Sequence, residues 1–171
     1  MKKTILVLAD HPMFPSGVGT QTRYMIEGLL KTGKYRFICF GGAMHHEDTR
    51  PAKTKEWGDD WIIYPVKGYG TPEMVRSALR KERPDMLWLM TDPRFWGWLW
   101  EIEDEIRPLM PMIYYHVWDN YPHPRFNRGH YLSNDVVVTI SNVTNNIVKT
   151  VAPEVELFHV PHAVDTKVFT P

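Results

Sequence analysis

The sequence predicts an α/β domain in which a mostly parallel β-sheet of six to seven strands lies between two layers of helices. Two observations support this prediction. Short apolar runs alternate along the chain with segments whose apolar residues recur at helical spacing. The runs are apolar almost without interruption, which is typical of parallel strands buried on both faces. A chain of 171 residues is long enough for one such domain, and we expect it to span residues 1–171.

Seven apolar runs are the predicted strands. They are residues 4–9, 35–40, 61–66, 85–90, 110–117, 135–140 and 155–160. Pro65 lies near the end of the third run, and proline is tolerated at a strand end or at the edge of a sheet because it lacks an N–H. The polar segment 43–60 is expected to form a loop, and residues 161–171 a tail.

The first predicted helix follows the first strand and ends at Gly33. Its inward face carries apolar or small residues at helical spacing, namely Val18, Thr22, Met25, Ile26 and Leu29. Thr71, followed by Pro72, is a typical helix start, and this second helix is expected to reach Glu82. Ser141 can cap another helix just before the last strand.

Asp92 and Pro93 predict the start of a further helix between the fourth and fifth strands. One face of this helix carries Phe95, Leu99, Ile102 and Ile106. A second face carries Trp96 and Trp100, which we interpret either as packing residues or as a surface for a partner domain or subunit.

The composition excludes several classes of function. The 20 basic residues balance the 20 acidic ones, so there is no electrostatic case for a nucleic-acid partner. Peripheral contact with a membrane stays open, but no apolar run approaches the roughly 20 residues of a membrane span. Cys39 is the single cysteine. It excludes a disulfide within the chain and favours a reducing compartment, so we expect the protein in the cytoplasm.

The turn between the first strand and the first helix is the main candidate site. Open parallel sheets bind ligands beyond the carboxyl ends of their strands. Ser16, Gly17, Val18 and Gly19 lie at such an end, and glycine lets the backbone approach a ligand closely. The first amides of a helix lack internal partners and attract phosphate or carboxylate. These residues therefore predict a substrate- or diphosphate-binding corner, although the glycines can also serve only helix–strand packing.

Polar residues that follow other strands complete the predicted site. His116 and Asp119 follow the fifth strand, and a histidine there can bind a hydroxyl or phosphate and share a proton near neutral pH. We expect His116 to face Gly17 across a shared crevice, with a structural histidine as the alternative. Asp92 and Ser141 are further candidates for substrate binding, although each is also explained as a helix cap.

Two other classes of site are disfavoured. The Gly17-x-Gly19 pattern lacks the third glycine of a dinucleotide-binding turn, because Thr22 stands there, and no acidic residue ends the second strand. His45, His46 and Asp48, like His159 and His162, do not belong to a larger set with a recognised metal geometry. We therefore predict no metal site and no bound cofactor.

Four segments carry a resemblance to a known family. Phe14-Pro-Ser-Gly-Val18 follows the first strand, Tyr115-His-Val-Trp-Asp119 ends the fifth, and Val137-Val-Thr-Ile-Ser141 leads from a strand into a helix. Residues 160–171 read Val-Pro-His-Ala-Val-Asp-Thr-Lys-Val-Phe-Thr-Pro. Their order resembles the amino-terminal domain of family 4 glycosyltransferases of the GT-B fold. Ser16 replaces the first of two glycines usual in that family, and His162-Ala163 replaces an Asn-Gly pair.

The resemblance implies a Rossmann-like, acceptor-binding domain that works with a second domain holding a nucleotide-sugar donor. That donor domain has no counterpart among these residues. The implied reaction is retaining sugar transfer to a sugar or glycolipid acceptor, without a metal or other cofactor. The resemblance implies that His116 and Asp119 lie at the reacting groups, while Ser16, Gly17, Val18, Gly19, Asp92 and Ser141 bind substrate or diphosphate. The alternative is a non-catalytic α/β module that binds a nucleotide, an effector or a carbohydrate.

Overall fold

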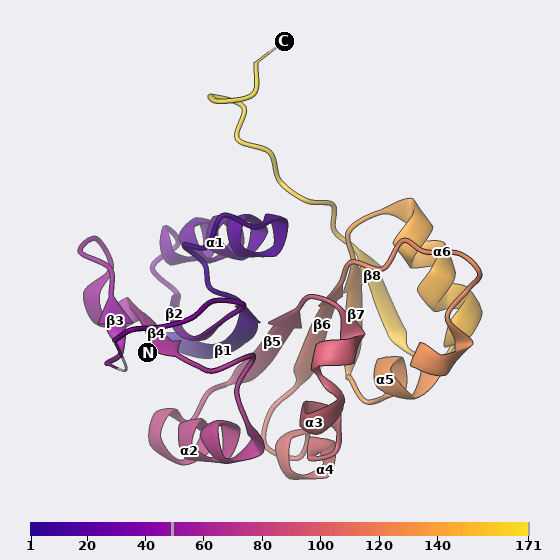
Figure 1. The fold of residues 1–171 in the computed structure, drawn as a ribbon, viewed down its shortest axis with the longest axis horizontal. Coiled ribbons are helices and arrows are strands. Elements are labelled where there is room, and N and C mark those ends of the chain that lie inside the picture. The colour runs from indigo at the N-terminus through magenta and orange to yellow at the C-terminus, as the bar shows by residue number, and fades with distance from the viewer. Residues whose placement is uncertain (49, 171) are drawn as a thin grey trace.

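One eight-stranded sheet runs through the whole molecule (Figure 1). The computed structural model describes residues 1–48 and 50–170. The strands are β1 (Lys3–Asp10), β2 (Tyr35–Gly42), β3 (Ala52–Lys53), β4 (Trp61–Pro65), β5 (Met86–Met90), β6 (Met112–His116), β7 (Val136–Thr139) and β8 (Glu156–His159). The spatial order is β3-β4-β2-β1-β5-β6-β7-β8. Every described pairing is parallel except that of β3 with β4.

The predicted fold class is confirmed, with one strand more than expected. The seven predicted strands are present, and the additional strand, β3, lies within segment 43–60, which we expected to be a loop. Position 49 of that predicted loop and position 171 of the predicted tail lie outside the described residues.

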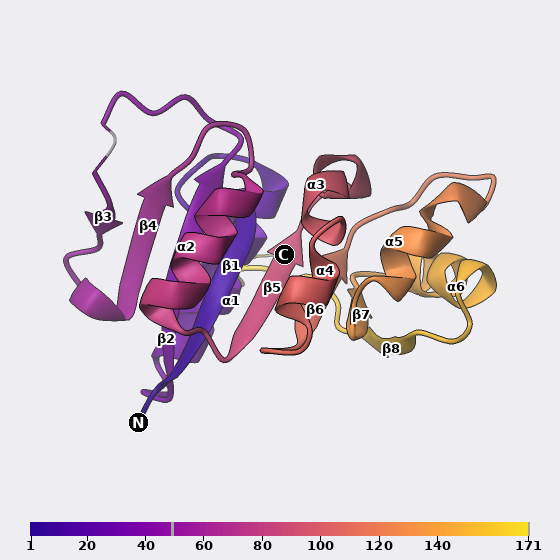
Figure 2. The ribbon, with the colours of Figure 1, turned by 90° about the horizontal axis from the view of Figure 1, so that it is seen from below.

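The helices cover the two faces of the sheet unequally. They are α1 (Gly17–Leu30), α2 (Pro72–Glu82), α3 (Gly97–Trp100), α4 (Glu103–Ile106), α5 (Arg128–Leu132) and α6 (Asn142–Val151). The strand order reverses after β4, and right-handed crossovers on either side of a reversal put their helices on opposite faces. Figure 1 shows α1 above the sheet and α2 below it, and Figure 2 shows α2 in front of the sheet with α1 behind. None of the described helices is long and apolar enough to cross a membrane.

Each face of the sheet has its own hydrophobic core. We call one the five-helix face, because its core includes buried residues of α2 to α6, among them Val75, Leu99, Ile106, Tyr131 and Ile147. We call the other the α1 face, because its core takes Ile26 and Leu30 from α1. Side chains alternate along β1, so that Leu6 packs on the five-helix face and Val7 on the α1 face.

The segment from Asp92 to Ile106 differs from its prediction. A single helix was expected, but the chain forms a 3₁₀ turn (Pro93–Phe95) followed by the short helices α3 and α4. Both indoles of the second predicted face are buried, with Trp96 0% and Trp100 6% exposed. The interpretation of these two tryptophans as a partner surface is therefore wrong, because they fill the five-helix core.

The predicted helix caps are present. The side chains of Thr71 and Ser141 accept hydrogen bonds from Met74 N at 3.3 Å and Thr144 N at 3.1 Å. Gly33 lies just beyond α1 with a φ of +70°, a conformation that glycine adopts readily and that ends a helix.

Candidate functional site

The reversal of strand order lies between β1 and β5, and its carboxyl-terminal side is where open sheets bind ligands. The segment after β1 contains the predicted glycine corner, and the segment after β5 contains Thr91 and Asp92. The sequence therefore places several of its candidate residues at the position that the topology favours.

The two glycines of the corner have different roles. A Cβ atom on Gly19 would lie 2.6 Å from Phe14 O and 2.8 Å from His11 O, so the loop before α1 packs directly on this glycine. A Cβ on Gly17 would meet nothing within 4 Å, and Gly17 is exposed. Gly19 is thus required for packing, whereas Gly17 borders open space.

The Ser16 side chain makes two hydrogen bonds that hold the glycine corner in place. Its Oγ accepts a hydrogen bond from Gly19 N at 2.9 Å and donates one to Asp10 Oδ2 at 2.6 Å. Asp10 is 6% exposed, and its other carboxylate oxygen accepts a hydrogen bond from the hydroxyl of Tyr69 at 2.9 Å. Asp10 therefore ties the start of α1 to the loop that precedes α2.

Two tyrosine hydroxyls, those of Tyr69 and Tyr114, donate hydrogen bonds in this region. Burial and the hydrogen bond to Asp10 raise the pKa of Tyr69, so its hydroxyl stays protonated and donates. The Tyr114 hydroxyl donates to Thr91 O at 2.7 Å. Thr91 has a φ of 107°, a conformation that is unfavourable for a β-branched residue and is retained only where its surroundings enforce it.

His116 lies in the interior. Its exposed fraction is 0%, and its Nε2 lies 2.8 Å from the hydroxyl of Tyr131. Its ring centroid is 4.8 Å from that of Tyr114. Burial lowers the pKa of His116 to about 3, partly offset by the charge of Asp92, so the imidazole is neutral at pH 7.

The structure does not bring His116 and Gly17 together across one crevice. Tyr114 and Tyr131, which contact the His116 ring, belong to the core of the five-helix face. Gly17 begins α1, which covers the opposite face. The expectation failed because alternation along β6 directs His116 to the same face as Tyr114.

The remaining candidates are Asp92, Ser141 and Asp119. Asp92 accepts a hydrogen bond from Arg94 N and pairs with the Arg94 side chain, both at 2.9 Å. Partial burial alone would raise the pKa of Asp92, but the hydrogen bonds from Arg94 lower it. Ser141 caps α6, and Asp119 is exposed in the segment after β6. Asp92 and Ser141 thus act as helix caps, the structural role that the sequence offered as the alternative to substrate binding.

A cleft of about 640 Å³ opens between the start of α1 and the tail. We call it the α1–tail cleft. Its lining consists of Pro15, Ser16, Gly17, Thr20, Gln21, Tyr24, His162, Ala163, Val164, Asp165 and Phe169. The side-chain amide of Gln21 pairs with the backbone of Ala163, donating to its O at 2.8 Å and accepting from its N at 3.0 Å. This pair of hydrogen bonds holds the tail beside α1.

The chemistry of the cleft suits hydroxyl groups better than phosphate. Thr20, Gln21 and Tyr24 offer neutral donors and acceptors, and the one charged lining residue is Asp165. The buried carboxylate of Asp10 lies behind Ser16 and opposes the partial positive charge of the helix start. Among the described residues, the lining contains no lysine or arginine, the side chains that most often hold phosphate.

The sequence did not predict the paired histidines as metal ligands. Within residues 1–48 and 50–170, no three His, Cys, Asp or Glu side chains converge as a metal site requires. His45 and His46 line a separate cleft, where His46 Nε2 lies 2.6 Å from Gly41 O.

Sequence reasoning missed three residues of this region. Asp10 directly follows the apolar run of β1, and a carboxylate at that position could have been recognised as part of the site. Tyr69 and Gln21 carry no comparable signal, because their partners lie 59 and 142 residues away.

Comparison with known proteins adds no assignment. No protein-family model matches the chain, and no curated protein matches it.

Proposed function

We propose that this chain is the acceptor-binding domain of a glycosyltransferase that transfers a sugar from a nucleotide-sugar donor with retention of configuration. The observation that carries the proposal is the α1–tail cleft. The glycine corner and the tail are two of the four segments that resemble family 4 glycosyltransferases, and here they line one cleft although they lie at opposite ends of the sequence.

In this proposal the acceptor lies in the α1–tail cleft. The free amides at the start of α1, near Gly17 and Val18, and the side chains of Thr20 and Tyr24 bind its hydroxyls. The absence of basic residues from the lining favours a neutral sugar or the sugar part of a glycolipid over the donor diphosphate. The diphosphate is assigned to the donor-binding domain of the family. We place the protein in the cytoplasm, because Cys39 is its single cysteine and is a buried free thiol.

The chemical step needs no strong base from this chain. The bond between the sugar C1 and the phosphate oxygen breaks, a bond from C1 to the acceptor oxygen forms on the same face, and the acceptor proton passes to the leaving phosphate. The contribution of this domain is orientation of the acceptor, which can lower a barrier by several kcal/mol. Within the proposal, His116 acts indirectly, by fixing the end of β6 from the interior. Asp119 is exposed but does not line the cleft, so it is given no contact with the acceptor.

Two glycines of α1 provide a matched test. Gly17→Val places a side chain in the mouth of the cleft, and Gly28→Val makes the same change at an exposed position of the same helix that also has no neighbours within 4 Å. Saturation-transfer NMR of the chain with a panel of methyl hexosides should give signals for at least one sugar. Gly17→Val should weaken this binding by about tenfold, equivalent to ~1.4 kcal/mol, and Gly28→Val should not. Equal binding by both variants would place the acceptor elsewhere.

Transfer itself requires the donor-binding domain. In a two-domain protein that contains this chain, Gly17→Val should lower kcat/KM for the acceptor with little change in donor affinity. In calorimetry, UDP and GDP should give no heat of binding with the 171-residue chain, and tight nucleotide binding by it would mean that the donor site is misassigned.

The burial of His116 favours a second candidate, a carbohydrate-binding module without transferase activity. The one histidine proposed for catalysis is inaccessible and neutral, and Asp92 and Ser141 serve as caps. A two-domain protein that binds hexosides in the α1–tail cleft but shows no turnover would support this candidate over the transferase.

A further inference from the structure

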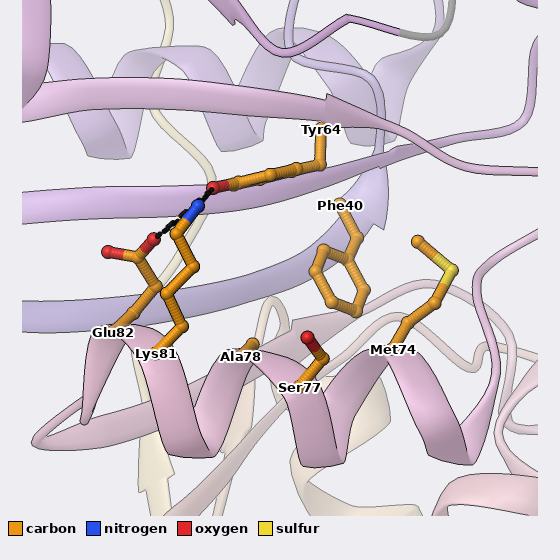
Figure 3. Close-up of a pocket in the computed structure, with 7 residues that line it drawn as sticks. All are labelled: Phe40, Tyr64, Met74, Ser77, Ala78, Lys81 and Glu82. Atoms are coloured by element: carbon orange, nitrogen blue, oxygen red, sulfur yellow. Dashed lines mark hydrogen bonds and ion pairs between the residues drawn. The ribbon is translucent and has the colours of Figure 1, made fainter.

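A small notch lies between α2 and β4, on the five-helix face of the sheet and away from α1 (Figure 3). Its volume is about 170 Å³. Phe40 and Ala78 form its buried floor, Tyr64 and Met74 its walls, and Ser77 and Lys81 lie at its mouth. A dry cavity of roughly 150 Å³ is known to accept benzene, so the notch has room for one aromatic ring.

The notch exists because α2 covers β4 incompletely. Val75 and Ala78 pack on the sheet, whereas Ser77 and Lys81 lie one turn apart on the outer flank of α2. At the edge of the sheet beside β4, the short strand β3 pairs with Ile62 and Ile63 and does not reach Tyr64. The Tyr64 ring therefore stands above α2 with the short side chain of Ala78 below it, and Figure 3 shows the Phe40 ring and the Ser77 hydroxyl facing the space between them.

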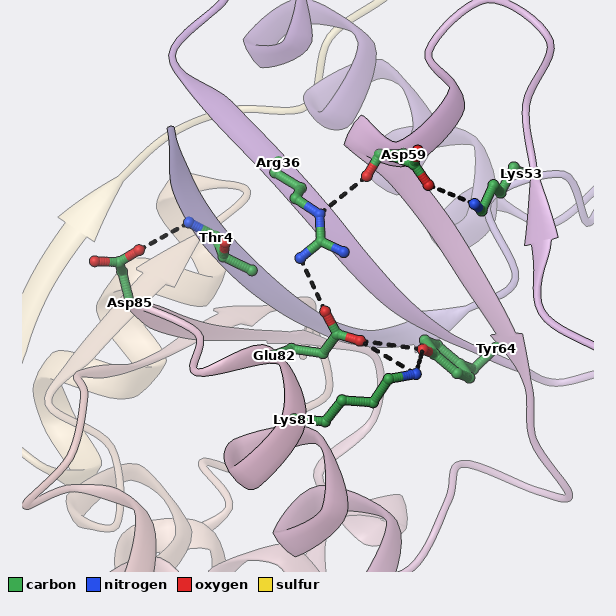
Figure 4. Close-up of polar contacts among 8 residues, drawn as sticks. All are labelled: Thr4, Arg36, Lys53, Asp59, Tyr64, Lys81, Glu82 and Asp85. Atoms are coloured by element: carbon green, nitrogen blue, oxygen red, sulfur yellow. Dashed lines mark hydrogen bonds and ion pairs between the residues drawn. The ribbon is translucent and has the colours of Figure 1, made fainter. Parts of the chain in front are cut away.

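The polar groups at the mouth leave a positive charge in excess (Figure 4). Glu82, whose side chain is 10% exposed, pairs with Arg36 at 2.9 Å and accepts a hydrogen bond from Tyr64 at 3.2 Å. Lys81 donates to the Tyr64 hydroxyl at 3.0 Å, and its ammonium lies 5.5 Å from the Tyr64 ring centroid. Its side chain is 68% exposed. The Lys81 ammonium also pairs with Glu82 at 3.6 Å. One carboxylate is thus shared by Arg36 and Lys81, and the ammonium keeps a donor for an anion.

We propose that the notch binds a small aromatic carboxylic acid, with its ring between Phe40 and Tyr64 and its carboxylate against the Lys81 ammonium. The ring matches the size and the apolar lining of the notch, and the carboxylate matches the excess charge at the mouth. The site is on the opposite face of the sheet from the α1–tail cleft and uses none of its residues. It is therefore independent of the proposed acceptor function and would make the domain responsive to an effector.

Phenylacetate is the probe for this site, with phenethylamine and benzyl alcohol as cationic and neutral comparators. Titration of the isotope-labelled chain, followed through backbone amide shifts, should give a dissociation constant on the order of 1 mM for a ligand of this size. The shifted amides should cluster on α2 and β4. The two comparators should bind several-fold more weakly, because they lack the carboxylate.

Three variants on α2 test the assignment. Ser77→Trp fills the mouth from an exposed position and should abolish binding. Lys81→Met should weaken phenylacetate binding about threefold to fivefold, as expected for an exposed ion pair, and remove the preference over benzyl alcohol. Arg80→Met removes an exposed cation of the same turn that does not line the notch, and it should leave binding unchanged.

The proposal is overturned by any of three results. These are no amide shifts up to about 20 mM phenylacetate, shifts that cluster away from α2 and β4, or equal affinity for phenethylamine. Retained binding by Ser77→Trp, checked to be folded by its amide spectrum, would also overturn it.

Discussion

Helices cover the two faces of the sheet to different extents. Residues of five helices fill the core of one face, including the large buried side chains of Trp100 and Tyr131. On the other face α1 is the one described helix, and beyond it the strands β6 to β8 carry half-buried side chains such as Ile113 and Val138, while Phe158 is 51% exposed. Apolar strands alone therefore do not indicate which face of the sheet a helix covers, because the direction of the crossover decides it.

The largest effect is expected where α1 attaches to its face. Gly19→Ala would place a methyl group against two backbone oxygens, which cannot move aside as a side chain can. Since no other described helix covers this face, we expect a loss of about 3 kcal/mol in the free energy of unfolding. Denaturant titration measures it, with Gly28→Ala as the control, which should change stability by less than about 1 kcal/mol. Equal effects would show that α1 is not held at Gly19.

A pair of adjacent valines compares the faces directly. Val137 is fully buried on the five-helix face, and Val138, the next residue of β7, is half-buried on the α1 face. Val137→Ala should cost about 2–3 kcal/mol, because it removes buried methyl groups and leaves a cavity, whereas Val138→Ala should cost about 1 kcal/mol or less. Similar losses in both variants, measured by denaturant unfolding, would contradict the unequal coverage.

His116 gives the five-helix face a pH dependence. Its folded pKa of about 3 is below its unfolded value of about 6.5, so below pH 6.5 the unfolded chain binds a proton that the folded chain does not. Stability should therefore fall by about 1.4 kcal/mol per pH unit from this residue between pH 6 and pH 5. Burial also lowers the pKa of His130 and His162, which contribute with the same sign. The difference in slope between the protein and His116→Gln isolates His116, and identical slopes would show that it is accessible to protons.

The smallest effect is expected at the tail. Gln21→Ala removes the two hydrogen bonds that hold Ala163. Because both groups are exposed to water, the loss in global stability should be within about 1 kcal/mol. Hydrogen exchange at the Ala163 amide should nevertheless become several-fold faster, while exchange in β7 stays the same. Unchanged exchange at Ala163 would mean that the tail is held beside α1 by other contacts.

The strands and most helix starts could be predicted because they depend on local signals. Near-continuous apolar runs gave seven strands, and Thr71 and Ser141 act as caps where the sequence placed them. The segment after Asp92 could not be predicted, because Trp96 turns inward against Tyr69, with ring centroids 5.2 Å apart, and tertiary packing overrides the helical pattern. The two-residue strand β3 could not be predicted either, because no apolar run marks it in the sequence.

The position of the candidate cleft follows from the topology, but most of the residues that line it could not be predicted. The rule for open sheets placed it at the carboxyl ends of the strands, and Gly17 does border a cleft there. The separation of His116 from Gly17 depends on which face each side chain takes, which follows from the strand register of the whole sheet. The contact between Gln21 and Ala163 spans 142 residues, and no periodicity in the sequence indicates it.

The place of β1 in the middle of the sheet has a consequence for how the chain folds. Ile5 of β1 pairs with Phe37 on one side and with Met86 on the other. As the chain is synthesised, one edge of this very apolar strand therefore stays unpaired until β5 has emerged. During that interval the nascent chain exposes a sheet edge open to pairing with other molecules, and contacts between such distant segments form slowly.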